Sequence, residues 1–337
     1  KYLKLPIIAL TGSNGKTTTK ELINVVLSKK FKTKATIGNL NNHIGVPLTL
    51  LSFNSETEFG IVEMGANHKK EIEFLCELAT PDYGYITNFG KAHLEGFGGV
   101  EGVVIGKSEM YDYLSQNDKL AFINLEDAIQ VEKAKTLKSF SFGVNKEMAN
   151  VNINSIAANP FVEIQFSNHL IQTHLIGLYN ANNINAALTI GKYFGVDDLE
   201  IKEALESYIP ENNRSQLITK GTNRIILDAY NANPSSMSVA VENFLQLNDS
   251  NKIMILGDMF ELGNESPQEH KVLIDFLNDK KDVVIYFIGK EFYNQRTDSA
   301  NYWFFETFNT FSEYLSGNKI ENSSILIKGS RGMALER

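Results

Sequence analysis

An apolar run that breaks into a glycine-rich turn lies near the start of the chain, where residues 7–19 read IIALTGSNGKTTT. A helical pattern follows, so the predicted order is buried strand, tight turn and helix. Glycines let backbone N–H groups approach an anion, and the helix presents its positive N-terminal end. The order predicts a phosphate-binding loop, with Lys16 on the outer phosphates and Thr17 on Mg²⁺.

The loop is shorter than the usual G-x-x-x-x-G-K-(S/T) pattern, because Leu10 occupies the position of its first glycine. The motif here is G-x-x-G-K-T, starting at Gly12. A Gly-Lys-Thr triplet alone also occurs in strand-to-helix turns with a solvated lysine. The strand, loop and helix in the required order favour a nucleotide phosphate site.

Composition excludes several classes of protein. A chain of 337 residues with 43% hydrophobic content can bury a large core, and its length suggests two domains. A net charge of -8 argues against a broad nucleic-acid footprint. The one cysteine, Cys76, fits a reducing compartment. Without a membrane-length apolar run or a signal-peptide layout, the sequence predicts a cytoplasmic protein.

Apolar runs and helical patterns alternate along most of the chain. Strands are predicted at 7–10, 60–63, 83–87 and 120–124, with helices at 18–29 and 70–78, which is typical of a mostly parallel sheet. Period-two patterns over 138–177 predict an antiparallel meander. Helices at 180–194 and 197–208 and a hinge at 209–215 follow. A second series of strands and helices predicts a doubly wound α/β domain, giving domains at 1–210 and 211–337.

Glu63 ends the predicted strand at residues 60–63, at the sheet edge where open α/β sheets bind ligands. A carboxylate near Thr17 is the expected second protein ligand of a nucleotide-bound Mg²⁺. A helix-capping or solvated glutamate is the alternative. His93, in the Gly-rich segment ITNFGKAHLEGFG, is a candidate for a second metal or for phosphate, or else a structural histidine. The spacing alone indicates that Lys107 is a surface lysine.

Asparagines gather in two further segments. Asn41 and Asn42 precede the apolar part of TIGNLNNHIGVPLTLL, where amides suit either recognition of a peptide or sugar or the capping of loops. Asn180 and Asn183 start the helix in YNANNINAA, and Arg214 lies in the predicted hinge. These three residues suit adenine and phosphate contacts, or caps and a surface charge. The residues alone leave both interpretations open.

Polar residues also follow the strands of the second predicted domain. They are Asp228, Tyr230 and Asn231 in LDAYNANPSS, Asp258 in LGDMFELG, and Lys328 and Arg331 in IKGSRG. Strand-end polar groups in both domains predict a cleft between the domains, where an enzyme with two substrates places its chemistry.

Eight segments of the chain, in their order, resemble motifs of the Mur ligases of bacterial peptidoglycan synthesis. They are TGSNGKTT, NNHIGVPLTLL, EMGANH, AHLEGFG, YNANN, DAYNANPSSM, GDMFELG and KGSR. The resemblance spans nearly the whole chain, and the shortened loop is that family's normal form. It implies a P-loop central ATPase domain with a mostly parallel sheet and an antiparallel side layer, then a Rossmann-like α/β domain. The family's N-terminal UDP-sugar domain is expected to be lacking, because the chain begins at the P-loop strand.

The resemblance implies a role for each matching residue. The ATP phosphates are expected to bind to Gly12, Ser13, Asn14, Gly15, Lys16, Thr17 and Thr18. Thr17 and Glu63 are expected to bind one Mg²⁺, and His93 and Lys107 a second. The family's lysine matching Lys107 is often carbamylated, which turns a cation into a carboxylate-like ligand.

Further roles are implied outside the loop. They are adenine contacts for Asn180 and Asn183, phosphate for Arg214, ribose for Asp228, and the nucleotide or an incoming dipeptide for Asn231 and Lys328. Asn41 and Asn42 are candidate substrate contacts on the strength of their amides. The family commonly has a histidine where this sequence has Tyr179, directly before Asn180.

NNHIGVPLTLL and GDMFELG resemble the family members that join D-alanyl-D-alanine to UDP-N-acetylmuramoyl-tripeptide, using ATP and an acyl-phosphate intermediate. These two compounds are the implied partners of a monomer without nucleic acid or a membrane span. The alternatives are a folylpolyglutamate synthase-like ligase, a ligase that adds another amino acid, and a non-catalytic P-loop nucleotide-binding module. For this stretch of sequence, weak or no ligation is expected, because the UDP-sugar domain is expected to be absent.

Overall fold

The computed structural model describes residues 4–211 and 213–337, which form two compact units. The first unit runs to Gly90 and resumes over Gly96–Ile209, and the second comprises Lys91–Glu95 and Pro210–Arg337. The loop Lys91–Glu95 thus belongs to the second unit, although its neighbours on both sides belong to the first. The hinge predicted at 209–215 includes residue 212, which lies outside the described residues.

The first unit is built on a seven-stranded sheet in the order β2-β3-β1-β4-β5-β6-β7, with parallel pairing throughout. Its strands are β1 Ile7–Thr11, β2 Thr33–Ala35, β3 Phe59–Glu63, β4 Tyr83–Ile86, β5 Leu120–Asn124, β6 Lys138–Val144 and β7 Val151–Ile153. Both β1 and β3 are buried along their whole length, as expected for a parallel sheet covered on both faces. Leu10 pairs with Glu63, so the two strands end at one edge.

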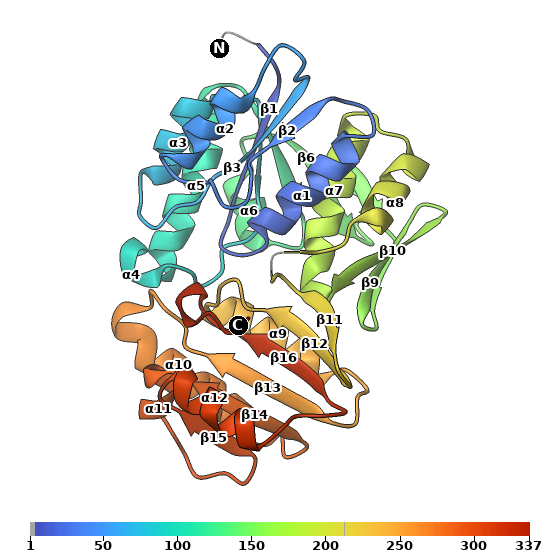
Figure 1. Ribbon diagram of the computed structural model, residues 1–337. Helices are drawn as coiled ribbons and strands as arrows, with labels where there is room; N and C mark the ends of the chain where they lie inside the picture. The colour runs from blue at the N-terminus through green and yellow to red at the C-terminus, as the bar shows by residue number, and fades with distance from the viewer. Residues whose placement is uncertain (1–3, 212) are drawn as a thin grey trace. The chain divides into compact units, whose positions relative to one another are not determined.

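Helices cover both faces of this sheet (Figure 1). One layer joins α1 to α7 and α8, and the other joins α3 to α2 and α5. The helices are α1 Lys16–Leu27, α2 Gly45–Ser52, α3 Glu71–Ala79, α4 Leu94–Phe97, α5 Val100–Gln116, α6 Ala128–Lys133, α7 Ala181–Tyr193 and α8 Asp198–Ser207, with a 3₁₀ turn at Leu178–Asn180. Leu22 and Val26 of α1 are fully buried in the same core as Ile184 and Leu188 of α7, which holds the apolar face of α1 on the sheet.

A separate three-stranded antiparallel sheet has the order β10-β9-β8. Its strands are β8 Ser155–Ala158, β9 Phe161–Phe166 and β10 His169–Ile176. This confirms an antiparallel side layer, but the meander predicted over 138–177 is wrong in its first part, because β6 and β7 pair in parallel with the main sheet. Alternating polarity indicates a strand without fixing the direction of its neighbour. The unpredicted helix α6 supplies the crossover that a parallel β5–β6 pair needs.

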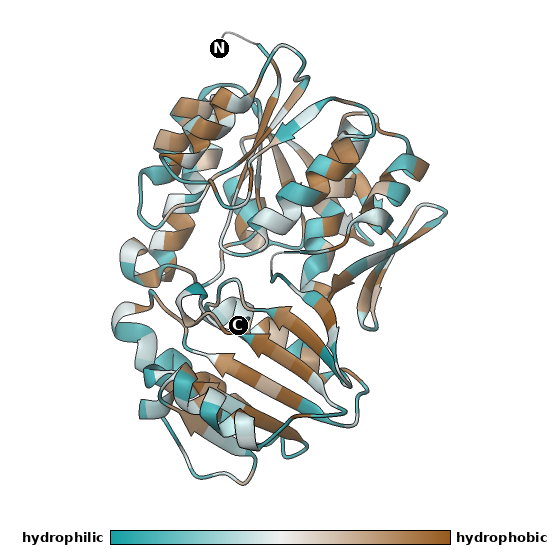
Figure 2. Ribbon diagram, in the orientation of Figure 1, coloured by the Kyte–Doolittle hydropathy of each residue, from teal (hydrophilic) through white to brown (hydrophobic). Residues whose placement is uncertain are grey.

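The second unit has a six-stranded sheet in the order β11-β12-β16-β13-β14-β15. Its elements are β11 Gln216–Lys220, β12 Asn223–Asp228, α9 Pro234–Leu245, β13 Lys252–Gly257, α10 Ser266–Leu277, β14 Val283–Ile288, α11 Lys290–Asn294, β15 Tyr302–Phe305, α12 Phe308–Gly317 and β16 Ser324–Lys328, with 3₁₀ turns at Gly263–Glu265 and Arg331–Met333. β11 pairs antiparallel with β12, and the other pairs are parallel. The predicted α/β class is confirmed, whereas β11 and α11 were not predicted. Hydrophobic residues concentrate along these strands (Figure 2).

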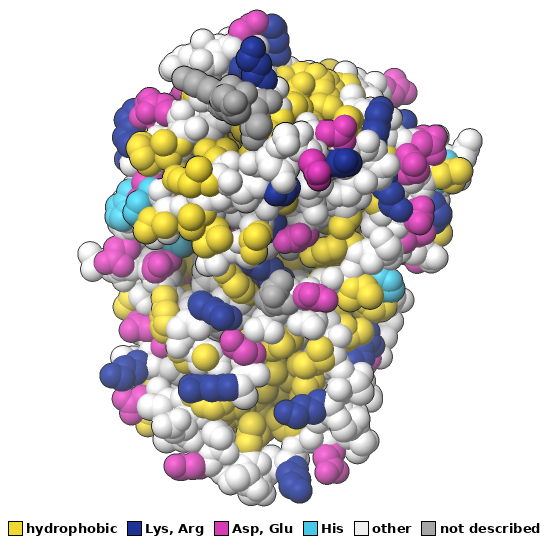
Figure 3. All heavy atoms as spheres, turned by 45° about the horizontal axis from the view of Figure 1, so that its top comes forward, with side chains coloured by type: hydrophobic (Ala, Val, Ile, Leu, Met, Phe, Trp, Pro, Cys, Tyr) yellow, Lys and Arg dark blue, Asp and Glu magenta, His cyan; other side chains and the backbone are white. Residues whose placement is uncertain are grey.

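Charged side chains lie mainly on the surface, where basic and acidic groups are interspersed on the face drawn in Figure 3. Among the described residues, the buried lysines are Lys20, Lys107 and Lys328. No helix in the described part of the chain is both long and apolar enough to cross a membrane.

Candidate active site

β1 leads into the predicted phosphate-binding loop at the sheet edge, and α1 begins at Lys16 directly after it. Gly12 and Gly15 have φ angles of 140° and 80°, which residues with a Cβ rarely adopt. A Cβ at Gly12 would lie 2.0 Å from Thr87 Oγ1, and one at Gly15 would lie 2.5 Å from Asn183 Oδ1. The residue before α1 is Gly15, which has no side chain to cap the helix, and a helix N-terminus of this kind suits a phosphate.

The loop is held from the end of β4. Asn88 Oδ1 accepts from the Asn14 N–H, and Asn88 Nδ2 donates to the Asn14 carbonyl, each at 3.0 Å. Thr87 Oγ1 donates to the same carbonyl at 2.6 Å, and Ser13 Oγ donates to the Gly90 carbonyl at 2.7 Å. Sequence reasoning missed Thr87 and Asn88, although their place directly after a buried strand of the same sheet was a usable signal.

Lys16 lies back over the loop, because its Nζ donates to the carbonyls of Gly12 and Ser13 at 2.7 and 3.2 Å. Thr18 is buried in the first turn of α1. An ammonium held at the loop is placed to meet phosphate oxygens that enter it.

Asn180 and Asn183 are both buried, and they join α7 to the loop helix. Asn183 Oδ1 accepts from Thr19 Oγ1 at 3.1 Å, and Asn183 Nδ2 donates to Asn180 Oδ1 at 2.9 Å. Asn180 Nδ2 in turn donates to the Ile176 carbonyl at 2.8 Å. These bonds give both asparagines a structural role beside the loop, and an adenine contact by either stays a prediction.

Thr17 and Glu63 are in direct contact, since Thr17 Oγ1 donates to Glu63 Oε1 at 3.2 Å. Asn41 Nδ2 donates to the same oxygen at 2.7 Å. Glu63 is 1% exposed, and its Oε2 makes no hydrogen bond with any described residue. A buried carboxylate oxygen without a donor fits a cation, and one carboxylate with one hydroxyl is a typical protein share of a nucleotide-bound Mg²⁺.

The described residues contain no group of three His, Cys, Asp or Glu side chains arranged to hold a metal by themselves. A cation at Glu63 would therefore take its other ligands from the phosphates and from water, as Mg²⁺ does at nucleotide sites.

Asn42 has a local role. Its Oδ1 accepts from the backbone N–H groups of Ile44 and Gly45, at 3.1 and 2.9 Å, where α2 begins. Asn42 thus caps the backbone at the start of α2, which is one of the two roles considered from the sequence. Of Asn41 and Asn42, only Asn41 contacts Glu63. A substrate contact by either residue stays a prediction.

Lys107 lies on α5 and is fully buried, so its interpretation as a surface lysine from spacing is wrong. Its Nζ donates at 3.1 Å to the carbonyl of Ala66, in the loop that follows Glu63. Burial, with a smaller contribution from the charge of Lys16, holds the pKa of Lys107 well below its ordinary value. A neutral amine is the form that reacts with carbon dioxide, so burial fits carbamylation, which stays a prediction.

His93 lies in the segment Lys91–Glu95 of the second unit, whereas Lys107 lies in the first. His93 Nδ1 is 2.5 Å from Glu261 Oε2, and this hydrogen bond lowers the pKa of Glu261. The structure therefore places the two residues in different units, and a second Mg²⁺ shared by them stays a prediction.

In the second unit, Asp228 and Lys328 end the neighbouring strands β12 and β16 in register. Lys328 Nζ lies 2.5 Å from Asp228 Oδ2, and the lysine is 2% exposed. Asp228 Oδ1 accepts from the Ser215 N–H at 3.0 Å, and Lys328 Nζ lies 3.4 Å from the Asn231 carbonyl. This ion pair, of a buried lysine with a partly buried aspartate, brings three predicted site residues together.

Two guanidinium groups lie near the ring of Tyr230. The Cζ atoms of Arg214 and Arg331 are 3.6 and 5.4 Å from its centroid. Arg214 Nε is buried and makes no hydrogen bond with the residues that the structure describes. The concentration of positive charge suits a phosphate, and that contact by Arg214 stays a prediction.

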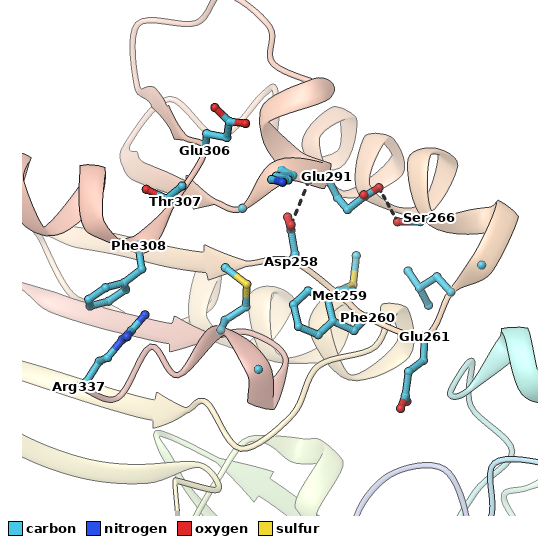
Figure 4. A pocket seen from close by; sticks show the side chains of 16 residues that line it. Asp258, Met259, Phe260, Glu261, Ser266, Glu291, Glu306, Thr307, Phe308 and Arg337 are labelled. Atoms are coloured by element: carbon cyan, nitrogen blue, oxygen red, sulfur yellow. Dashed lines mark hydrogen bonds between the residues drawn. The ribbon is translucent and has the colours of Figure 1, made fainter.

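A cavity of about 460 Å³ opens at the carboxyl ends of β13, β14 and β15 (Figure 4). Charged residues of both signs line it: Asp258, Glu261, Glu291, Glu306, Lys290 and Arg337. Asp258 accepts from the N–H groups of Glu291 and Phe292, each at 3.0 Å, yet burial raises its pKa. Arg337 Cζ lies 4.0 Å from the ring centroid of Phe308. Such a lining fits a small ligand with both charges.

Two models of protein families match the chain, one in each of its two parts. The model of the Mur ligase middle domain matches residues 10–191, and that of the Mur ligase, glutamate ligase domain matches residues 213–331. The chain belongs to the Mur ligase family and is an ATP-dependent ligase, which confirms the resemblance seen in the sequence.

Its curated relatives include UDP-N-acetylmuramoyl-tripeptide–D-alanyl-D-alanine ligases. That of Bacillus subtilis is 32% identical over 98% of this chain and 74% of the relative, and that of Escherichia coli is 30% identical over 98% and 75%. Among solved structures, MurF from Acinetobacter baumannii has a TM-score of 0.87 and 32% identity, with 98% of this chain and 75% of that chain covered. MurF from Thermotoga maritima, in complex with ADP, has a TM-score of 0.83 and 27% identity over 98% and 78%.

Proposed function

We propose that this chain joins D-alanyl-D-alanine to UDP-N-acetylmuramoyl-tripeptide, with ATP cleaved to ADP and phosphate. The observation that carries the proposal is the contact between Thr17 and Glu63 beside the phosphate-binding loop. It occurs in a chain that is 32% identical, over 98% of its length, to a ligase named for these two substrates. ATP is the cosubstrate, so we place the reaction in the cytoplasm.

In the first step, a carboxylate oxygen of the tripeptide attacks the γ-phosphorus of ATP. The bond to the β–γ bridging oxygen breaks, ADP leaves and an acyl phosphate forms. Two anions must meet, so the loop N–H groups and the ammonium of Lys16 hold the phosphates and offset their charge. Mg²⁺ held by Thr17 and Glu63, with a second ion at Lys107 and His93, would neutralise phosphate charge. Lys107 would serve in its carbamylated form.

In the second step, the neutral amine of D-alanyl-D-alanine attacks the acyl carbon, phosphate leaves, and the nitrogen gives up a proton to water. We assign the dipeptide to the cavity at the strand ends of the second unit. A dipeptide carries an amine and a carboxylate, and the lining offers acidic groups such as Glu306 for one and Arg337 for the other. No side chain of the protein acts as a nucleophile in this scheme.

The test is product formation by the full-length protein, with any UDP-sugar domain included. With ATP, Mg²⁺ and both substrates, mass spectrometry should detect the UDP-muramoyl pentapeptide, and phosphate release should depend on the dipeptide. Single amino acids in place of the dipeptide, or a folate with glutamate, should give no product. Ligation of one of those pairs, with the tripeptide and dipeptide inert, would assign the chain to another ligase. ATP binding without any product would indicate a non-catalytic nucleotide-binding module.

A further inference from the structure

A fully buried lysine lies beside the catalytic carboxylate and has no part in the scheme above. Lys20, on α1, is 0% exposed and follows Thr17 by one helical turn, so both side chains lie on one face. Removing an ammonium from water is unfavourable, and a methionine of similar length would fill the same space without that penalty. The buried charge therefore calls for an explanation in terms of its partners.

Three oxygen atoms of described residues lie within 3.1 Å of the ammonium of Lys20. Its Nζ donates to the carbonyls of Thr36 and Gly38, at 2.6 and 3.1 Å, and pairs with Glu21 Oε1 at 2.8 Å. An ammonium has three N–H groups, and these three acceptors match them. Two of the three are backbone carbonyls, so Lys20 ties α1 to the start of the loop that follows β2.

Residues at both ends of that loop, Thr36 and Asn41, form hydrogen bonds with Glu63. Thr36 Oγ1 accepts from the Glu63 N–H at 3.0 Å, and Asn41 Nδ2 donates to Glu63 Oε1 at 2.7 Å. The Asn41 carbonyl also accepts from the Gly65 N–H at 2.8 Å. Lys20 therefore holds the segment that fixes Oε1 of the carboxylate in place.

Lys20 also faces the other carboxylate oxygen. Its Nζ lies 4.0 Å from Glu63 Oε2, the oxygen that makes no hydrogen bond in the described part of the chain. The distance is too long for a hydrogen bond, so Oε2 keeps its capacity to bind a cation. Lys20 supplies positive charge nearby without occupying the ligand position.

We propose that Lys20 is a positioning residue for the nucleotide and Mg²⁺ site. It fixes the loop from Thr36 to Asn41, and this loop turns Glu63 so that Oε2 faces the cation. The inference rests on the proposed function, because it takes Glu63 to be the Mg²⁺ ligand.

A lysine that acted only as a charge would behave differently. Removing a positive charge 4.0 Å from a metal ligand would strengthen Mg²⁺ binding, because like charges repel. Loss of positioning would weaken Mg²⁺ binding instead. The two roles therefore predict opposite shifts in the Mg²⁺ requirement.

The experiment compares Lys20→Met with Lys29→Met in the full chain. Lys29 is a partly exposed lysine that pairs with Glu203, so the control makes the same substitution away from the site. Binding of a fluorescent ATP analogue is titrated with Mg²⁺ below the melting temperature of each variant. We expect Lys20→Met to raise the half-saturating Mg²⁺ concentration about tenfold, and hydrogen exchange over residues 36–42 to accelerate, with Lys29→Met unchanged. An unchanged or lowered Mg²⁺ requirement in Lys20→Met would overturn the inference.

A double-mutant cycle separates positioning from general stability. If Lys20 acts through the loop, Asn41→Ala should raise the Mg²⁺ requirement in the wild-type background and add little in Lys20→Met. Full additivity of the two shifts would contradict the inference. If Lys20→Met does not fold, Lys20→Gln replaces it, and failure of both to fold would make Lys20 a residue of stability alone. A wild-type chain that binds the analogue without any response to Mg²⁺ would instead refute the proposed function.

Discussion

Thr17 Oγ1 lies 3.2 Å from Glu63 Oε1, although the two residues are 46 positions apart in the sequence. The contact exists because β1 and β3 are parallel neighbours whose carboxyl ends meet, so the helix after one strand approaches the last residue of the other. A hydroxyl and a carboxylate thus converge beside the phosphate-binding loop. These two groups are the protein ligands of the proposed Mg²⁺ site.

Glu63→Gln should nearly abolish ligation while the chain stays folded. The amide keeps the size of the side chain and removes the charge that binds a cation, so we expect kcat to fall by roughly 100-fold or more. Phosphate release in the presence of both substrates measures the loss. Thr17→Ser is the matched control, since it keeps the hydroxyl and should retain most activity. Wild-type turnover by Glu63→Gln would remove Glu63 from the site.

Gly15→Ala should weaken ATP binding by roughly 10-fold or more, because a Cβ at a φ of 80° is strained and would lie 2.5 Å from Asn183 Oδ1. Adding Asn183→Ala removes the close contact and leaves the strain, so the double variant should recover only part of the affinity. Calorimetric titration with an ATP analogue gives both values. Full recovery of the ATP affinity would show that the close contact with Asn183, rather than the backbone conformation, is what requires a glycine at position 15.

The phosphate loop and the Glu63 pairing were predictable because strand order places those residues without any detail of packing. The contact of Asn41 with Glu63 was not predictable, because it depends on the course of a loop that tertiary contacts hold, including those of Lys20 with the Thr36 and Gly38 carbonyls. Lys107 was misread because a lysine in a helix is normally placed in solvent, although Val103, Met110 and Leu114 at helical spacing put it on the apolar face. The parallel pairing of β6 escaped the period-two pattern, which is the same for both directions of pairing.

Lys107→Met should stabilise the first unit and abolish ligation. The folded state holds the pKa of Lys107 below its ordinary value, so the unfolded chain binds more protons in the pH range between the two. Wild-type stability should therefore rise with pH across that range, and Lys107→Met should lack this increase and melt a few degrees higher near neutral pH. Urea unfolding followed by circular dichroism from pH 6 to 9 checks this. Identical pH profiles would contradict the burial of an uncharged amine.

Lys328→Met should destabilise the second unit by about 2 kcal/mol, because it leaves the partly buried carboxylate of Asp228 without its partner. The double variant with Asp228→Asn should recover part of that loss. Trp303, the one tryptophan of the chain, lies on β15, so its fluorescence in urea reports on this unit. Equal destabilisation in the single and double variants would argue against a coupled ion pair.

An oxygen label can be followed from the tripeptide carboxylate into the phosphate that is released. The reaction is run with UDP-N-acetylmuramoyl-tripeptide labelled with ¹⁸O at both oxygens of its terminal carboxylate, together with ATP and D-alanyl-D-alanine. Attack of that carboxylate on the γ-phosphorus predicts one ¹⁸O atom in each phosphate released, and Lys16→Ala should release almost none. Unlabelled phosphate accompanying the ligated product would contradict an acyl-phosphate mechanism.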